Sequence, residues 1–196
     1  MGEYMVSVLI PAYNIEPCVE IVESALKGIN HETIVQYDVK GEGKGITLQR
    51  AFNRAKGDKI VWIDADMQLH PSYIPTMLKI MEDTQSDIVI TSKRHRESEV
   101  NVSTTRRMLS FATYLFIRLL FNLPLTDTQA GLKLFRRETL ENKWNLKGFG
   151  YDVEVLWNAH KRGYKITEIP IKITGSSVNF NSVIKTFREI LWLRLH

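Results

Sequence analysis

Residues 60–66, Ile-Val-Trp-Ile-Asp-Ala-Asp, decide the fold of this chain. The apolar run 60–63 is β-branched and aromatic, which is typical of a buried parallel strand, and open α/β sheets bind ligands at the carboxyl ends of such strands. Asp64 and Asp66 are one residue apart, so in an extended segment their side chains point the same way. They could share one Mg²⁺ or Mn²⁺ ion that keeps positions open for the phosphate oxygens of a nucleotide. An ordinary acidic turn after a strand is the alternative.

Length and composition favour one globular domain over residues 1–196. The chain is 44% hydrophobic and 24% charged, which excludes a disordered chain and allows a sizeable core. Cys18 is the single cysteine, so no internal disulfide can form, and its apolar neighbours predict a buried thiol. The N-terminus lacks the apolar core of a signal peptide, which predicts a cytosolic location. A formal charge of +4 suits a phosphate-bearing partner.

Strand-like runs alternate with helical patterns, which predicts a mostly parallel sheet covered by helices. Strands are expected over 6–10, 34–37, 60–63 and 88–91, with Pro11 ending the first. Helices are expected over 16–28, 46–55 and 71–83, and a glycine-rich loop precedes the second helix. No repeat or linker divides the chain.

Five motifs occur in a specific order, although each alone is weak. They are PAYN (11–14), GEGKG (41–45), AKGDKIVWIDADMQ (55–68), DTQAGLK (127–133) and GFGYDVE (148–154). In this order they resemble the family 2 glycosyltransferases of GT-A fold, and within them the dolichol-phosphate mannose synthase-like group. The resemblance spans residues 5–196. It implies a Rossmann-like α/β fold that binds a nucleotide sugar and loads the sugar onto a polyprenyl or dolichyl phosphate.

The resemblance implies a donor site around the acid pair. The segment after strand 34–37 is shortened relative to the family, which weakens the role of Asp38 in reading the nucleoside; GDP-mannose is slightly favoured over UDP-glucose. GEGKG lacks the spacing of an ATP- or GTP-binding P-loop, and Lys44 is either a nucleotide contact or a solvated loop lysine. The implied donor residues are Pro11, Tyr13, Asn14, Asp38, Lys44, Asp64, Ala65, Asp66, Gln68, Lys93 and Arg94.

The resemblance makes Asp127 the leading catalytic candidate beside Asp66, because in the family such an aspartate lies near the sugar and the acceptor. A phosphate acceptor is already ionised near neutral pH, so positioning is favoured over a base role for Asp127. Charge on the departing nucleoside diphosphate would be stabilised by the cation and by nearby Lys or Arg, and in-line attack would invert the anomeric centre. Asp152 is either a helix cap or a substrate contact. Candidate acceptor and diphosphate contacts are Arg106, Arg107, Gln129 and Ser177, whereas Val178 stands where the group often has lysine.

Two segments favour a membrane-bound acceptor. Residues 108–125 are apolar but are interrupted by Arg118, and a spanning helix needs about 20 largely apolar residues. We expect a helix near 106–123 on the membrane face, with a core helix as the alternative. Ser182 would cap an amphipathic C-terminal helix, 182–196, that is either a peripheral anchor or an ordinary packing helix. Its apolar stripe is Ile184, Phe187, Leu191 and Leu195, with Trp192 beside it.

These observations predict an inverting, metal-dependent transferase that moves a hexose from a nucleotide sugar to a polyprenyl phosphate. It would be peripheral at the cytosolic face of a membrane, with or without an anchoring partner. Two alternatives stay open: a family 2 transferase with a soluble glycan acceptor, and a non-catalytic nucleotide-sugar-binding subunit. Nucleic acid is not an expected partner, because the basic residues form no patch interleaved with aromatic residues.

Overall fold

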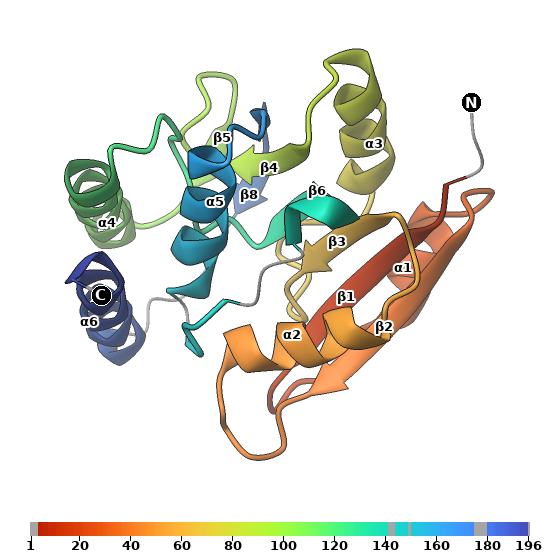
Figure 1. The fold of residues 1–196 in the computed structure, drawn as a ribbon, viewed down its shortest axis with the longest axis horizontal. Coiled ribbons are helices and arrows are strands. Elements are labelled where there is room, and N and C mark those ends of the chain that lie inside the picture. The colour runs from red at the N-terminus through yellow and green to blue at the C-terminus, as the bar shows by residue number, and fades with distance from the viewer. Residues whose placement is uncertain (1–3, 141–143, 149, 175–179, 196) are drawn as a thin grey trace.

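A six-stranded sheet forms the centre of the molecule, with helices on both faces (Figure 1). The computed structural model describes residues 4–140, 144–148, 150–174 and 180–195. The strand order is β2-β1-β3-β6-β4-β7. The strands are β1 (Val6–Ala12), β2 (His31–Tyr37), β3 (Lys59–Ile63), β4 (Ile88–Ser92), β6 (Leu132–Arg136) and β7 (Ile166–Pro170). Strands β5 (Glu99–Asn101) and β8 (Lys172–Thr174) form a small parallel pair beside it.

The predicted mostly parallel sheet is confirmed, with one antiparallel strand that the sequence did not predict. Strand β6 lies between β3 and β4 and runs antiparallel to both, whereas the β1–β2, β1–β3 and β4–β7 pairs are parallel. All five residues of β3 and of β4 are buried, as expected for strands covered on both faces. Pro11 does not end β1, which continues to Ala12. Within β1, only Val6–Leu9 pair with β3, so at Pro11 one side of β1 is an edge, where proline is tolerated.

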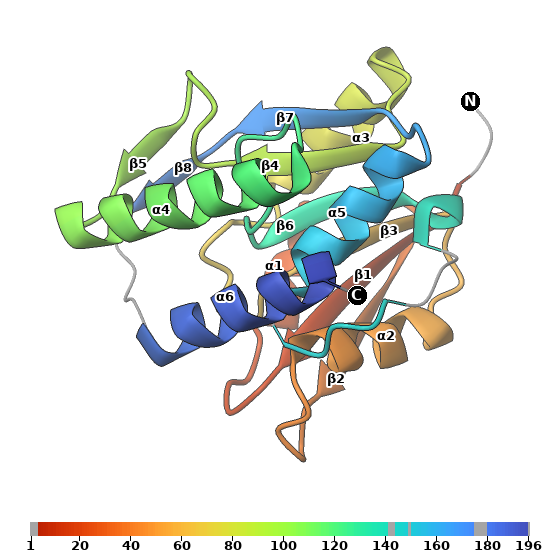
Figure 2. The same ribbon diagram turned by 60° about the vertical axis from the view of Figure 1, so that its left-hand side comes forward.

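The helices divide between the two faces of the sheet (Figures 1 and 2). On one face, α1 (Val19–Ala25) and α3 (Tyr73–Asp83) cover a core that includes Val8, Val61 and Leu134. On the other face lie α2 (Lys44–Arg54), α4 (Thr104–Phe121), α5 (Tyr151–Lys161) and α6 (Phe180–Leu195). A 3₁₀ turn, Arg137–Leu140, follows β6.

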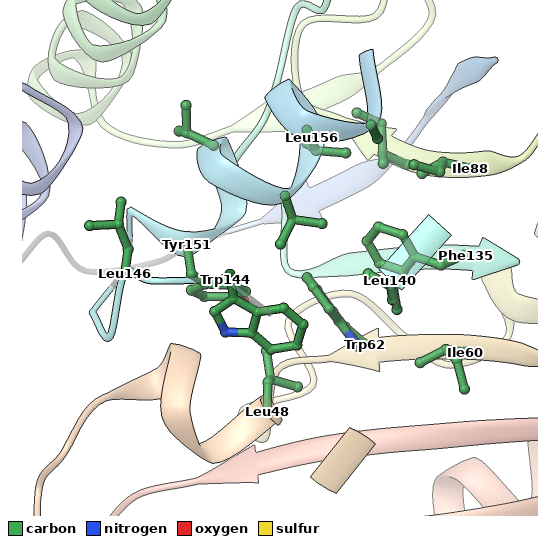
Figure 3. Close-up of a cluster of buried hydrophobic side chains, with 14 of the residues drawn as sticks. Leu48, Ile60, Trp62, Ile88, Phe135, Leu140, Trp144, Leu146, Tyr151 and Leu156 are labelled. Atoms are coloured by element: carbon green, nitrogen blue, oxygen red, sulfur yellow. The ribbon is translucent and has the colours of Figure 1, made fainter. Parts of the chain in front are cut away.

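The core behind the acid pair is aromatic. The Trp62 ring centroid on β3 lies 4.4 Å from that of Phe135 and 5.5 Å from those of Trp144 and Tyr151 (Figure 3). The Trp144 indole N–H donates to the Gly45 carbonyl at 2.9 Å, so the segment before α5 is attached to the start of α2. Large rings therefore fill the space between β3, α2 and α5 and support the loop that follows β3.

The prediction of a buried Cys18 thiol is wrong. Cys18 is exposed because it is the residue before α1, which begins at Val19. Its thiol donates to the Glu20 carboxylate at 3.4 Å on the surface. The buried face of this helical segment is formed instead by Val22 and Leu26.

Candidate active site

The acid pair lies in a turn at the carboxyl end of β3. The segment is not extended as expected, because the Met67 N–H donates to the Asp64 carbonyl at 3.0 Å and Met67 has φ 49°. Asp64 and Asp66 nevertheless line one pocket, which we call the acid-pair pocket. Partial burial and then the negative charge of Asp64 raise the pKa of Asp66. The other residues lining this pocket are Gln68, Leu69, Lys93, Arg106, Gln129, Gly131, Ile171 and Ile173.

Gly131 and Lys44 both contact Asp64. The Asp64 N–H donates to the Gly131 carbonyl at 3.1 Å, and a Cβ on Gly131 would overlap the Asp64 carboxylate. Lys44, the first residue of α2, forms an ion pair with Asp64 and lies 5.7 Å from the centre of the Tyr151 ring. Burial is the largest single influence and acts to lower the pKa of Lys44, but the charge and hydrogen bond of Asp64, with the negative charge of Tyr151 and Asp152, together keep that pKa well above its usual value. Lys44 is therefore a fixed cation beside the acid pair, not a solvated loop lysine.

A second cavity of 310 Å³ adjoins Lys44 at the ends of β1 and β2, and we call it the nucleoside pocket. Tyr13 lines it with an exposed ring, whereas Asn14 does not line it and has φ 52°. Asp38 lines the same cavity, but its carboxylate accepts the N–H groups of Glu42 (2.9 Å) and Gly43 (2.8 Å). Asp38 therefore shapes the GEGKG loop, and its expected role in reading the nucleoside finds no support in these contacts. The other lining residues are Pro11, Ala12, Gly41, Gly43, Lys44 and Thr47.

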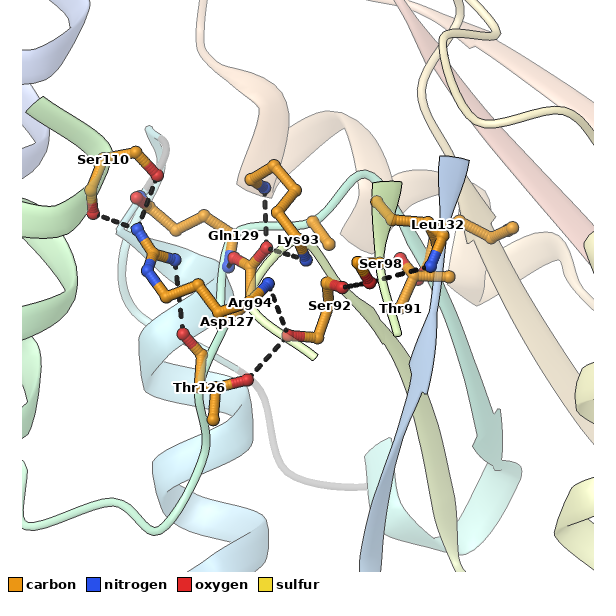
Figure 4. Close-up of polar contacts among 12 residues, drawn as sticks. Thr91, Ser92, Lys93, Arg94, Ser98, Ser110, Thr126, Asp127, Gln129 and Leu132 are labelled. Carbon is orange, nitrogen blue, oxygen red and sulfur yellow. Dashed lines mark hydrogen bonds and ion pairs between the residues drawn. The ribbon is translucent and has the colours of Figure 1, made fainter. Parts of the chain in front are cut away.

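Asp127 is buried beneath Lys93. Its carboxylate accepts the Lys93 backbone N–H at 3.0 Å, the Lys93 ammonium at 2.7 Å and the Gln129 N–H at 3.1 Å (Figure 4). Burial is the largest single influence and acts to raise the pKa of Asp127, but the charge and hydrogen bonds of Lys93, with the charge of Arg94, together lower that pKa below its usual value. A carboxylate of this kind is a weak proton acceptor, so the contacts favour the positioning role.

A third cavity of 350 Å³ opens beyond Lys93, and we call it the basic groove. Arg106 lines it as well as the acid-pair pocket, and Arg107, which donates to the Val100 carbonyl at 3.2 Å, lines the groove alone. Its apolar wall includes Phe111 from α4. The remaining lining residues are Lys93, Arg94, Ser98, Val100, Val102, Ser110 and Ile173.

Arg94 does not line the acid-pair pocket, contrary to the expectation that it lies near the diphosphate. Its guanidinium donates to the Thr126 carbonyl at 3.2 Å and to the Ser110 hydroxyl at 2.6 Å, and it lies 5.0 Å from the centre of the Tyr114 ring (Figure 4). These contacts join the end of β4 to α4. Arg94 therefore builds the wall of the basic groove.

Asp152 does not cap α5, and its contacts lend no support to the alternative of a substrate contact. Asp152 is buried and pairs with Lys133 of β6 at 2.7 Å, while Gly150 is the residue that precedes α5. Lys133 was missed, although a lysine inside the apolar run Leu132–Phe135 is a signal for a buried ion pair. Ser177 and Val178 lie outside the described residues.

The acid pair fits a hard divalent cation through the chemistry of its donors. Within the described ranges, no three His, Cys, Asp or Glu side chains gather to form a complete metal site. Two carboxylates in an open pocket suit Mg²⁺ or Mn²⁺, which commonly bind one or two protein carboxylates and fill the other positions with water and substrate phosphates. Asp64 and Asp66 would hold such an ion.

The model of the family described as glycosyl transferase family 2 matches residues 15–144. This chain belongs to glycosyltransferase family 2. It is 34% identical over 119 residues to an undecaprenyl-phosphate mannosyltransferase from Micrococcus luteus, a match that covers 58% of this chain and 48% of the relative. It is 28% identical over 159 residues to a dolichyl-phosphate beta-glucosyltransferase from Trichomonas vaginalis, covering 76% of this chain and 49% of the relative. The chain thus spans about half the length of these two relatives.

The fold is that of the GT-A glycosyltransferases. The structure matches glucosyl-3-phosphoglycerate synthase from Mycobacterium tuberculosis, crystallised with Mn²⁺, UDP and glucosyl-3-phosphoglycerate, with a TM-score of 0.77 and 18% identity. The match covers 97% of this chain and 80% of the synthase chain. The predicted fold class is confirmed.

Proposed function

We propose that this chain transfers a hexose from a nucleotide sugar to a polyprenyl phosphate. The observation that carries the proposal is that Lys93 and Arg106 line both the acid-pair pocket and the basic groove. Two sites that suit phosphate groups therefore lie side by side. The acid-pair pocket suits the diphosphate of the donor with its cation, and the basic groove suits the phosphate of the acceptor. The two curated relatives described above are named for transfer to undecaprenyl and dolichyl phosphate, which supports the same acceptor class.

The side chains divide the chemistry between them. A phosphate oxygen of the acceptor attacks the anomeric carbon, the bond from that carbon to the nucleoside diphosphate breaks, and attack from the opposite face inverts the configuration. A bound Mg²⁺ or Mn²⁺ would neutralise charge on the departing diphosphate. Lys44, Lys93 and Arg106 add fixed positive charge around it. No general base is needed, which agrees with the lowered pKa of Asp127.

The lipid part of the acceptor has an apolar path out of the basic groove. Phe111 lines the groove and belongs to an exposed stripe on α4 with Met108, Leu115 and Leu119. Helix α6 packs beside α4, with the Phe116 and Phe187 ring centroids 4.7 Å apart (Figure 2). It exposes Ile184, Leu191, Trp192 and Leu195.

We call these eight exposed side chains the α4–α6 apolar face. Large exposed apolar patches mark interaction surfaces, and exposed basic residues on the same two helices, Arg107 on α4 and Arg188 on α6, favour a surface of anionic lipid. No helix in the described part of the chain has the length and apolarity to cross a bilayer. We propose that this face rests on the membrane that holds the acceptor.

The test supplies the purified protein with Mn²⁺ or Mg²⁺, polyprenyl phosphate and either labelled GDP-mannose or labelled UDP-glucose. Label extracted into organic solvent measures transfer. We expect label from one donor and a loss of about 100-fold or more in Asp66→Asn, which removes a cation ligand but keeps the shape. Nucleotide binding without label would contradict the proposal and favour a soluble acceptor or a non-catalytic subunit.

A further inference from the structure

Glu168 binds the chain segment that carries Asp127. Glu168 lies on β7 opposite Ile90 of β4 and is half-buried. Its carboxylate accepts the Thr126 N–H at 2.9 and 3.0 Å through its two oxygens, the Thr126 hydroxyl at 2.9 Å and the Asp127 N–H at 3.0 Å. One side chain therefore receives three donors from two consecutive residues.

The same segment is attached to the end of β4. The Thr126 and Ser92 hydroxyl oxygens are 2.6 Å apart, and the Thr126 carbonyl accepts from Arg94. The next residue, Asp127, binds Lys93 through its carboxylate. Contacts thus run from Glu168 on β7, through the backbone of 126–127, to the ammonium of Lys93.

The charge of Glu168 suits this task. Residues 126–127 precede β6, so their N–H groups lie outside the strand pairing and need other acceptors. An ionised carboxylate accepts several hydrogen bonds at once, and each is stronger than a bond to a neutral amide oxygen. Glutamine at this position would keep one acceptor oxygen. Its NH₂ group is itself a donor, so it could not accept a hydrogen bond from the backbone N–H groups of 126–127.

We propose that Glu168 is a positioning residue, which fixes the backbone of Thr126 and Asp127 and thereby holds the Lys93 ammonium where the acid-pair pocket meets the basic groove. This inference rests on the proposed function. Glu168 lines none of the three cavities, so it acts through Asp127 and Lys93 without touching the substrate.

The first test is kinetic. We expect Glu168→Gln to lower kcat for transfer roughly 10- to 100-fold, because a misplaced charge at the reacting centre has effects of this size. The KM for the nucleotide sugar should change less than about twofold, since the nucleoside pocket is untouched. In the Asp127→Asn background, adding Glu168→Gln should lower kcat little further, because both changes release the same lysine. Additive losses, or a wild-type kcat in Glu168→Gln, would overturn the proposal.

The second test does not need turnover, so it separates this inference from the proposed function. Reductive methylation followed by mass spectrometry measures the reactivity of Lys93, whose side chain is 20% exposed and paired with Asp127. Methylation of Lys93 should rise severalfold in Glu168→Gln, as in Asp127→Asn, with Lys172 unchanged. A rise in Asp127→Asn alone would refute the role of Glu168. Glu32→Gln is the matched control, because Glu32 on β2 also accepts a hydroxyl and a backbone N–H (both 2.6 Å) but lies away from the cavities.

Discussion

At the scale of single residues, Gly131 determines where Asp64 can lie. Its carbonyl accepts the Asp64 N–H, and the space that a Cβ would need is filled by the Asp64 carboxylate. Glycine is thus required here because the charged Asp64 side chain approaches closely. The D-T-Q-A-G motif includes this glycine, but the motif alone does not show why glycine is needed.

We predict that Gly131→Ala displaces Asp64 and weakens the binding of Mn²⁺ with a nucleoside diphosphate about tenfold or more, through loss of a carboxylate ligand. Titration calorimetry measures this binding. Gly28→Ala is the control, because a Cβ there meets open space and the only strain is its φ of 85°. Equal binding by wild type and Gly131→Ala would show that Asp64 is not a ligand.

Asp127 gives a prediction about pH. Its pKa is lower in the folded protein than the usual 3.8, so its ionised form stabilises the fold at neutral pH, and this stabilisation is lost as the pH falls below about 3.8 through the folded pKa. Asp127→Asn should therefore lower the free energy of unfolding by about 1–3 kcal/mol at pH 7, with the difference from wild type shrinking toward pH 3. Urea unfolding across this range measures it. A difference that stays constant would contradict the ion pair with Lys93.

At the scale of elements, β6 and α5 are joined by the buried pair of Lys133 and Asp152. The two side chains are 2% and 5% exposed. Lys133→Met would leave a buried carboxylate without its partner, so we predict a loss of about 3–5 kcal/mol in urea unfolding. Replacing both residues, Lys133→Met with Asp152→Leu, should recover much of this loss. Failure of the double variant to recover would indicate that other groups depend on this pair.

The α4–α6 apolar face gives the second prediction at this scale. Leu119→Ser with Leu195→Ser should weaken binding to vesicles that contain anionic lipid about tenfold or more, because each leucine removed from water contributes roughly 1.5–3 kcal/mol. Sedimentation with vesicles measures binding. Val39→Ser is the control, since Val39 is 90% exposed but lies in the loop after β2. Undiminished binding of the double variant would mean that another surface meets the membrane.

At the scale of the whole molecule, local sequence patterns predict strands β1 to β4 but not β6 and β7, which complete the six-stranded sheet. Strands β1, β3 and β4 contain largely apolar runs, β2 contains a shorter one, and the neighbouring helices follow 3.6-residue spacing. Strand β6 was missed because Lys133 interrupts its apolar run, and a lysine is tolerated there because its ammonium pairs with Asp152 and donates to the Ala130 carbonyl. The antiparallel direction of β6 depends on contacts distant in sequence, which no local pattern contains.

The candidate site was predictable to a similar extent. Motif order located the acid pair, Lys44 and Lys93 near one edge of the sheet. It could not show that Asp127 lies beneath Lys93, that Asp38 holds a loop, or that Arg94 faces α4, because each depends on which donors the folded chain places nearby. Glu168 was missed because its partners lie about 40 residues earlier.

The most direct test of the central claim compares acceptors with one labelled donor: a polyprenyl phosphate, the same polyprenol without phosphate, and 3-phosphoglycerate. The basic groove with its apolar exit predicts a labelled product from the polyprenyl phosphate alone. A product from 3-phosphoglycerate, with none from the polyprenyl phosphate, would contradict the account.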